Sequence, residues 1–594
     1  MALSSSDDNP FNNIAPILHS KEYHLDALMN YNSKFSISSI FTLIPLFLVK
    51  IHLSIFFIWS MMVLAQTTLM FLAIKALSKS LIDSQIFILM NWTFLLLCKP
   101  YYLNLAGVSE LDYQPYAFWI ALSLGIFSLT NLIERKLSKL SAYCVLCYLF
   151  HPATGILLAI FLVIFIFLHE RLAFKKLCRN LVVIPLHAFC VVVYNFHDNV
   201  KSPNYIMKIL QENTHLNYWN PSSSSFGAFT IFLWLLVFSL GISVNYYAVD
   251  QKLKEAKQVF NLLGVFGIGA ILIQALSTKI NFLLVMSLVP ARISVFYVLL
   301  GFAVVLAQIQ LDIRERKLGS IFNLILVIYP SPYLLLSLAA GNHKDLKLRK
   351  VANYLRIVII ICGLVTISGY TIIHIYPFAP FWSKYYLDLT QFDLATPLRS
   401  SLVLYPVALL VFILIVYSLV RLICIQKMKW DIQQFFSISA GVLASLVIIS
   451  LGLQSQYQYS FQNNQFPVEK VKDLAQAQLW ASTNTPNNSN FIVTPVRAFT
   501  PWRTLSQRPV VTPGYVAGLY GINKETNAFN LKVTKFWQSH SGDFTSDENL
   551  CAFIHIFGGD YLVEDKSKPY SLLSSRKLVF SNNSYNIYNL NCEN

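Results

Sequence analysis

Apolar runs alternate with short polar segments that carry Lys and Arg along most of the chain, and this pattern stops near Gln454. A run of roughly 17 to 25 apolar residues is long enough to cross a hydrocarbon core about 30 Å thick. The pattern therefore predicts a bundle of membrane-spanning helices. The predicted spans are 54–76, 82–98, 116–134, 153–169, 180–196, 226–248, 258–276, 282–309, 351–376, 399–425 and 433–453.

Three further stretches depart from the length of a full span. Residues 140–150 are too few to cross alone, and residues 320–340 are interrupted by Pro330 and Pro332. Irregular backbone is tolerated at membrane depth where protein buries it, so we expect half-helices that turn inside the bundle. Residues 37–49 precede the first span and are expected to lie along the membrane interface. Together these stretches predict about 11–14 membrane segments.

The last part of the chain has the mixed periodicity of a small α/β domain. Helical patterns occur at 468–481 and 546–556, strand patterns at 491–494, 510–511 and 561–564, and a hairpin pattern at 578–590. The predicted fold class is mainly α, a polytopic transmembrane helix bundle with a C-terminal mixed α/β domain. We divide the chain into an acidic loop with an interfacial helix (1–53), the bundle (54–453) and the C-terminal domain (454–594).

Composition and charge give the bundle an expected orientation. Of the 594 residues, 55% are apolar and 12% are charged, more apolar than a water-soluble core requires. Cytoplasmic loops retain Lys and Arg, and most of these residues outside the C-terminal domain gather in loops that the spans place on one side. The basic loops are 75–81, 134–140, 170–180, 249–257, 310–318, 341–350 and 421–431. We therefore expect the N-terminal segment and the C-terminal domain on the extracytoplasmic side of the membrane.

The net charge of +16 follows from the same loops. It indicates orientation and attraction to anionic lipid rather than a nucleic-acid partner, because no basic cluster is interleaved with aromatic residues. The N-terminal residues MALSSSDDNPFNN lack the pattern of a signal peptide. Since an acidic extracytoplasmic segment normally follows a span, we expect a first transmembrane helix upstream of Met1.

Two pairs among the nine cysteines invite comparison. Cys551 and Cys592 are in the C-terminal domain, where an extracytoplasmic location permits a disulfide; two buried thiols are the alternative. Cys144 and Cys147 form a C-x-x-C spacing on an apolar helix, which is typical of packing rather than of metal or redox chemistry. The sequence contains no motif for a metalloprotease, a P-loop or a nucleophilic serine.

A cation within the predicted bundle is the first candidate for chemistry. Arg292 lies in SLVPARISVFYVLL, inside the predicted span 282–309. Because charge is costly at membrane depth, its guanidinium is expected to bind an anion such as a lipid phosphate, to pair with a buried carboxylate, or to extend to the interface. Lys279 would add to a phosphate site, although a single interfacial Lys is usually solvated.

Carboxylates in the extracytoplasmic loops are the second candidates. They are Asp7, Asp8, Glu22 and Asp26 before the first span, and Glu110 and Asp112 in YYLNLAGVSELDYQPY. Each is by itself an ordinary solvated acid, but a carboxylate beside an embedded cation can act as a general base while the cation stabilises a departing phosphate. His151, in LFHPATG, would lie beside such a cleft or would cap a turn that contains proline.

Three segments together with this layout resemble the GT-C superfamily of membrane glycosyltransferases. The segments are AGVSELDYQPYAFWIALSL, CYLFHPATGILLAIFLV, and LAQAQLWASTNTPNNSNFIVTP followed by SQRPVV, which are similar to bacterial, often cyanobacterial, multispan proteins of that type. The resemblance implies transfer of a sugar from a polyprenyl-phosphate or pyrophosphate carrier to a glycan, lipid or protein acceptor outside the cell. It also implies a base in the first extracytoplasmic loop, where Asp8 or Asp7 matches best.

On this resemblance we expect an inverting glycosyltransferase in which Asp8 is the base and Arg292 the donor-phosphate ligand. Glu110 or Asp112 would support the site or bind a divalent metal, and His151 would line the cleft. Trp480, Trp502 and Trp537 could stack on sugar rings, with burial in a core as the alternative. Two other classes stay open. Proline-broken helices and an embedded Arg also mark a transporter or lipid flippase, and a non-catalytic scaffold derived from such enzymes is the third.

Overall fold

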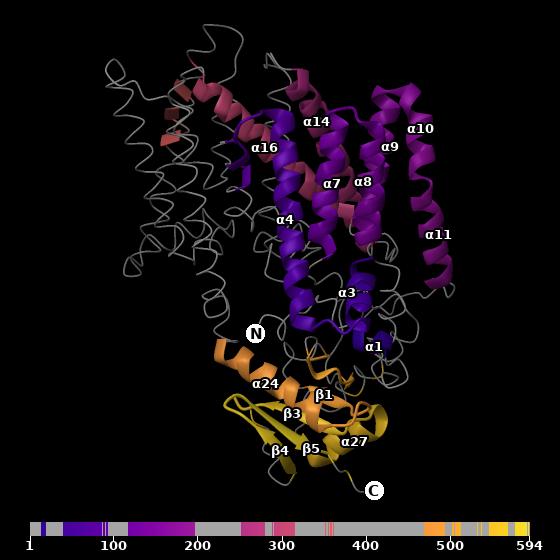
Figure 1. The fold of residues 1–594 in the computed structure, drawn as a ribbon, viewed down its shortest axis with the longest axis vertical. Coiled ribbons are helices and arrows are strands. Elements are labelled where there is room, and N and C mark those ends of the chain that lie inside the picture. Colours follow the sequence, from indigo (N-terminus) through magenta and orange to yellow (C-terminus); the bar gives the residue numbers. More distant parts are fainter. Residues whose placement is uncertain are drawn as a thin grey trace.

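The computed structural model describes residues 14–18, 40–92, 117–195, 251–279, 288–314, 351–361, 468–493, 502–511, 532, 536, 546–569 and 576–592, with short gaps inside several of these ranges. It is mainly helical, with a small sheet near the C-terminus (Figure 1). Among the described residues before 320, the helices include α1 (Ile14–Leu18), α3 (Ile40–Lys50), α4 (Ile55–Leu81), α7 (Ala117–Ile133), α8 (Leu137–Phe150), α9 (Pro152–His169), α10 (Arg171–Leu181), α11 (Val183–Asn195), α14 (Gln251–Lys279), the 3₁₀ turn η5 (Pro290–Arg292) and α16 (Ile293–Arg314).

Three of the described helices contain segments long and apolar enough to cross a membrane, by length and composition: Phe57–Leu81, Pro152–His169 and Glu255–Gln274. They fall on the predicted spans 54–76, 153–169 and 258–276. The predicted spans 226–248, 399–425 and 433–453, and the broken stretch 320–340, lie outside the described residues. The interfacial stretch predicted at 37–49 corresponds to α3.

Helix α7 lies in the middle of the bundle. Nearly all of its residues are buried, including Phe118 and Trp119, which have no exposed surface. It lies between α4 and α8, and Gly125 faces the ring of Phe296 on α16. One continuous apolar core therefore joins segments from across the first 314 residues.

The ends of several helices meet at one end of this bundle. Arg135, in the α7–α8 turn, pairs with Glu170 between α9 and α10 (3.7 Å) and with Glu255 near the start of α14 (3.1 Å). Gln310, near the end of α16, donates from Nε2 to Ser84 Oγ just beyond α4 (3.0 Å). Five of the basic segments that we expected on one side of a membrane thus lie together, at the top of Figure 1.

The α8–α9 hairpin is shorter than the long helices α4 and α14. Helix α8 has 14 residues, about 21 Å at 1.5 Å per residue, whereas α4 has 27 residues. The hairpin turns at His151, well before the lower end of α4 in Figure 1. The sequence predicted this short element at 140–150, and it is a complete helix paired with α9.

The predicted span 282–309 differs from the structure at its start. Helix α16 begins at Ile293, and Pro290–Arg292 form a 3₁₀ turn before it. Proline has no amide hydrogen and a fixed φ, so it suits the entry to a helix better than its interior. Arg292 is therefore in the turn just before α16. The apolar run had predicted that it lies inside the span.

The C-terminal domain is a five-stranded sheet with helices on both faces. Its elements are α24 (Val468–Asn484), β1 (Phe491–Val493), β2 (Val510–Val511), α27 (Asp547–Phe557), β3 (Tyr561–Asp565), β4 (Lys577–Ser581) and β5 (Tyr585–Asn589). The strand order is β2-β1-β3-β5-β4, in which β1 is parallel to β2 and β3, and β5 is antiparallel to β3 and β4. Alternate strand residues face opposite helices: Phe491 and Val563 pack with α24, and Ile492 and Leu562 with α27.

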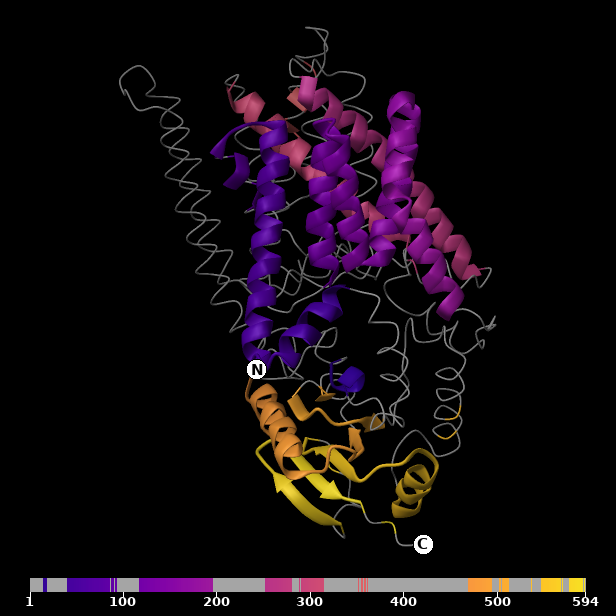
Figure 2. The same ribbon diagram turned by 45° about the vertical axis from the view of Figure 1, so that its right-hand side comes forward.

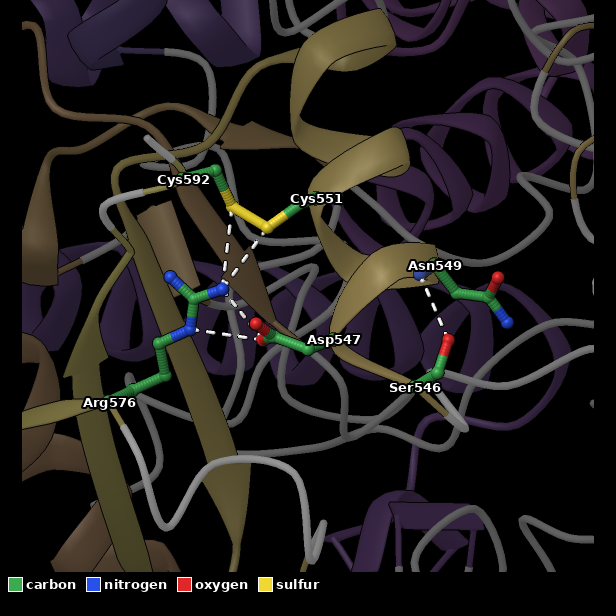
Figure 3. Close-up of a disulfide and its surroundings, with 6 residues drawn as sticks. All are labelled: Ser546, Asp547, Asn549, Cys551, Arg576 and Cys592. Carbon is green, nitrogen blue, oxygen red and sulfur yellow. Dashed lines mark hydrogen bonds and ion pairs between the residues drawn. A yellow bond between two sulfur atoms is a disulfide. The ribbon is translucent and has the colours of Figure 1, made fainter. Parts of the chain in front are cut away.

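A disulfide joins Cys551, on α27, to Cys592, beyond β5 (Figure 3). It connects the helix to the end of the chain across 41 residues of sequence. The guanidinium of Arg576 lies beside it, donating to Asp547 Oδ1 at 2.6 Å and lying 3.1 Å from Cys551 Sγ. Of the two alternatives that the sequence left open for these cysteines, the structure has the disulfide.

The C-terminal domain packs against the end of the bundle that lacks the basic segments. In Figures 1 and 2, α1 and α3 lie between the bundle and the domain. Leu505 of the domain is buried in the same apolar core as the bundle helices, and Ala475 of α24 packs against that core. The amide of Leu505 donates to Gln478 Oε1 on α24 (3.3 Å). The domain is thus in contact with the bundle and not only tethered to it.

Candidate site at the His151–Arg292 contact

Two residues singled out in the sequence, 141 positions apart, are in contact. Arg292 Nη1 lies 3.1 Å from His151 Nε2. His151 caps the N-terminus of α9 at the hairpin turn, and Arg292 ends the turn η5 that leads into α16. Both are partly exposed. The contact lies at the end of the bundle nearer the C-terminal domain.

The partners of His151 determine where its ring carries a proton. Arginine can only donate, so Nε2 of His151 must accept from Arg292. The neutral ring then has its proton on Nδ1, which donates to Thr154 Oγ1 at 2.9 Å. The opposite tautomer would let Nδ1 accept from the Thr154 amide at 3.3 Å, but it would set an N–H of the ring against an N–H of Arg292. The arrangement thus requires a neutral histidine that orients the guanidinium.

Phe118 packs against both residues of this contact. Its ring lies edge-on to the ring of His151, with centroids 5.7 Å apart, and the Arg292 Cζ atom lies 5.7 Å from its centroid. Phe118 has no exposed surface. A fixed aromatic ring beneath a guanidinium contributes a cation–π attraction of about 0.5–2 kcal/mol, depending on how far the pair is desolvated.

The guanidinium has no acidic partner among the residues that the structure describes. Its hydrogen bond to described groups is the one to neutral His151, and its Nε is buried without a hydrogen-bond partner. A cation held by a neutral ring and a phenyl ring retains its full positive charge. Of the roles that the sequence left open for Arg292, a pair with a buried carboxylate therefore finds no support in the described part of the chain, and an anion ligand fits it.

The segment that carries Arg292 is fixed by a glutamine. Gln274, on α14, accepts a hydrogen bond at Oε1 from the backbone amide of Ala291 (2.9 Å). Ser294 Oγ donates back to the carbonyl of Ala291. Gln274 is 1% exposed. The turn that positions the guanidinium is thus held from α14 and from α16 at once.

The other predicted site residues divide into two groups. Asp7, Asp8, Asp26, Glu110 and Asp112 lie outside the described residues, so their place relative to Arg292 stays a prediction. Lys279 is the last residue of α14, and its side chain is likewise outside the described part. Within the described ranges there is no group of three or more His, Cys, Asp or Glu that could hold a metal ion.

Trp502 requires a correction. Its side chain has no exposed surface and packs in the core of the C-terminal domain, with its ring centroid 5.2 Å from that of Phe491. It cannot stack on a sugar ring in this structure, so the alternative of a core tryptophan holds here. Its place follows from the sheet, because β1 and β2 bring the segment before β2 over the face covered by α24.

Two buried charged residues of the C-terminal domain, Arg508 and Glu564, have partners within the domain. The Arg508 guanidinium donates to the carbonyls of Ser482 and Thr485, both at 2.7 Å, and so closes the C-terminal end of α24. Glu564 accepts from Tyr588 Oη and Asn586 Nδ2. These groups serve packing and leave the Arg292 site as the strongest candidate for ligand binding.

The sequence reasoning missed Gln274 and Phe118. Neither is conspicuous in sequence, since a single glutamine in an apolar helix and a phenylalanine among many carry no pattern of their own. One signal was available: Gln274 is a polar residue near the end of the predicted span 258–276. Such a residue is expected to face the interior of a bundle and to have a partner there.

Comparison with known proteins returned no match: no family model, no curated protein and no solved structure is similar to this chain.

Proposed function

We propose that this protein is a polytopic membrane glycosyltransferase of the GT-C type, which uses a sugar linked to a polyprenyl phosphate. The observation that carries the proposal is the Arg292 guanidinium, held by neutral His151 and Phe118 with a buried, unpartnered Nε. A cation without a counterion at membrane depth favours binding of an anion that arrives through the bilayer. The phosphate of a lipid carrier is such an anion.

The length of α8 supports a site within the membrane. Its 14 residues extend about 21 Å, against about 30 Å for the hydrocarbon core. With the α7–α8 turn at the interface on the basic side, the turn at His151 lies inside the hydrocarbon layer near its opposite boundary. A lipid phosphate there would be near an acceptor that approaches from the side of the C-terminal domain.

In this function the charge on Arg292 acts while the bond between the sugar and the carrier phosphate breaks. Negative charge then grows on the departing phosphate, and a fixed guanidinium stabilises it more than it stabilises the intact donor. His151 keeps the guanidinium in place without neutralising it. Asp8, or Asp7, would remove the proton from the acceptor hydroxyl or amine, and the C-terminal domain would bind the acceptor or cover the cleft.

The test combines binding and turnover with purified full-length protein in detergent. Farnesyl phosphate is the binding probe, and farnesol, the same chain without the phosphate, is its neutral control. Wild-type protein should bind the first and not the second. Arg292→Gln should raise the dissociation constant at least about tenfold, the loss expected for one hydrogen bond to a charged group. Arg179→Gln, at an exposed cation of α10, should leave it unchanged.

Turnover separates the three classes of protein. Polyprenyl-phosphate sugars should be hydrolysed or transferred by wild type and not by Asp8→Asn, which should still bind the probe. Movement of the intact donor across proteoliposomes without chemical change would show a transporter or flippase instead. Folded protein that binds no farnesyl phosphate and turns over no donor would contradict the proposal and favour a scaffold.

A further inference from the structure

Gln274 has a donor group that its surroundings leave unused. Its Oε1 is committed as an acceptor to the amide of Ala291 at 2.9 Å, so the orientation of the side-chain amide is fixed. The amide nitrogen Nε2 must therefore point away from that backbone group. It is buried and has no hydrogen-bond partner within the described part of the chain.

An unused donor in this position is unusual for energetic reasons. Leaving a buried polar group unpaired is unfavourable, and the side chain of Gln274 is 1% exposed. A leucine or methionine would fill the same space without that cost. The bond to Ala291 accounts for the oxygen of the amide and leaves its NH₂ group unexplained.

A second unused donor belongs to the same turn. Arg292 Nε is also buried without a partner, and Arg292 follows Ala291 directly. Two donors that lack acceptors within the described residues thus belong to neighbouring positions: Gln274, which holds the amide of Ala291, and Arg292, the next residue of η5. A group rich in acceptor oxygens is the kind of ligand that such donors bind.

We propose that Gln274 Nε2 and Arg292 together form an oxyanion site for the phosphoryl oxygens of a lipid phosphate, with Gln274 a ligand-binding residue that the sequence did not predict. This inference rests on the proposed function for the identity of the ligand, while the donors themselves are observed. A neutral amide beside a guanidinium is suited to a phosphate monoester, because it adds a directed hydrogen bond without raising the positive charge that must be kept in the membrane.

The choice of variants separates ligand binding from support of the turn. Gln274→Glu keeps an oxygen that can accept from the Ala291 amide and replaces the NH₂ group with a second oxygen. Gln274→Met removes both. Gln310→Glu is the matched control, because Gln310 is a buried glutamine of α16 at the far end of the bundle.

The experiment measures farnesyl phosphate binding by calorimetry and hydrogen exchange of the amides at 291–294, for each variant in detergent. We expect Gln274→Glu to weaken binding about ten- to a hundredfold while these amides stay as protected as in wild type. Gln274→Met should weaken binding and also lose protection at Ala291. Gln310→Glu should bind as wild type does.

The outcomes for the two proposals differ. If wild type binds farnesyl phosphate, Arg292→Gln does not, and Gln274→Glu binds as tightly as wild type, then Gln274 only supports the turn and this inference is wrong while the proposed function stands. If wild type does not bind the probe at all, the proposed function fails first. Binding that Gln274→Glu and Arg292→Gln both abolish supports the shared site.

Discussion

At the scale of single residues, α8 and α9 approach each other closely at Gly155. A Cβ atom added there would lie 2.2 Å from Cα and 2.5 Å from the backbone nitrogen of Tyr148. No side-chain rotation relieves a clash with backbone, so α8 and α9 can approach this closely only because position 155 has no side chain. Small residues allow such contacts between helices in membranes. The close approach also sets the position of the His151 turn between the two helices.

We therefore expect Gly155→Ala to lower the free energy of unfolding by about 1–3 kcal/mol, the usual cost of overpacking. Gly269→Ala is the control, because a Cβ there meets nothing within 4 Å; alanine should be neutral or slightly stabilising at this helical position. Thermal unfolding in detergent gives both values. Equal midpoints for the two variants would contradict the close contact.

His151 has two separable contacts: at the N-cap position of α9 its Nδ1 bonds Thr154 Oγ1, and its Nε2 bonds Arg292. Asparagine is a good N-cap and alanine a poor one, but neither reaches the guanidinium. His151→Asn should therefore retain most of the stability that His151→Ala loses, about 1 kcal/mol. Both should weaken farnesyl phosphate binding, because Arg292 would lose its orienting partner. If His151→Asn binds the probe like wild type, the contact with Arg292 has no part in binding.

The sequence identified His151 and Arg292 but not their contact, and the reason is physical. Arg292 and His151 are conspicuous because each is a polar group in an apolar run. The cost of burying such a group can be inferred from its own segment of sequence. Their contact depends on how α9, α14 and α16 cross, which is set by the packing of Phe118, Gly125 and Phe296. No pattern in one segment specifies that packing. Gln274 was missed for the same reason, since its partner is a backbone amide.

At the scale of elements, the C-terminal domain follows its sequence pattern closely. Helices were predicted at 468–481 and 546–556, and they are Val468–Asn484 and Asp547–Phe557. The strands at 491–494, 510–511 and 561–564 agree with β1, β2 and β3 within one residue. Short amphipathic elements bounded by Asn, Pro, Ser and Gly are determined largely by local sequence. In the bundle, apolar runs predict helices well but do not locate their ends, as Arg292 shows.

The last residue of β3, Asp565, is a carboxylate whose protonation should affect this domain. Burial alone would raise the pKa of Asp565, but hydrogen bonds from Lys470 and from the amide and hydroxyl of Ser567, with the charge of Lys470, lower it below 3.8 overall. The Lys470 Nζ to Asp565 Oδ2 distance is 2.5 Å. This pair connects α24 to the end of β3.

Because the pKa of Asp565 is depressed in the folded state, its contribution to stability is complete above the unfolded-state pKa and is lost as the pH falls through the folded-state pKa. Asp565→Asn should therefore reduce the protection of β3 and β5 amides in hydrogen exchange at pH 7. The difference from wild type should shrink as the pH falls toward 3. Asp547→Asn is a comparison, since Asp547 pairs with Arg576 on the other side of the domain. A difference between wild type and Asp565→Asn that does not change with pH would contradict the assignment.

At the scale of the whole molecule, two ends of the bundle differ in chemistry. One end gathers basic segments and their ion pairs at Arg135. The other has the His151–Arg292 contact and meets the C-terminal domain through Leu505. In the orientation that the basic loops predict, the disulfide of the domain is in an oxidising compartment. In that predicted orientation Arg292 would lie at the end of the bundle nearer a water-facing domain.

The last prediction concerns the contact between the C-terminal domain and the bundle. Leu505 is 6% exposed and buried in the bundle's core cluster, whereas Leu578 on the edge strand β4 is 49% exposed. Leu505→Asp would bury an uncompensated charge and should cost about 3 kcal/mol or more at this interface, whereas Leu578→Asp should be nearly neutral.

Since the domain has its own core and disulfide, it should stay folded in the Leu505 variant but separate from the bundle. Limited proteolysis would then release an intact fragment that begins near α24 from Leu505→Asp, and not from wild type or Leu578→Asp. Release at the same rate from all three would show that the contact through Leu505 does not hold the domain in place. Loss of turnover in the Leu505 variant, with farnesyl phosphate binding unchanged, would place the domain in acceptor binding rather than in binding of the lipid phosphate.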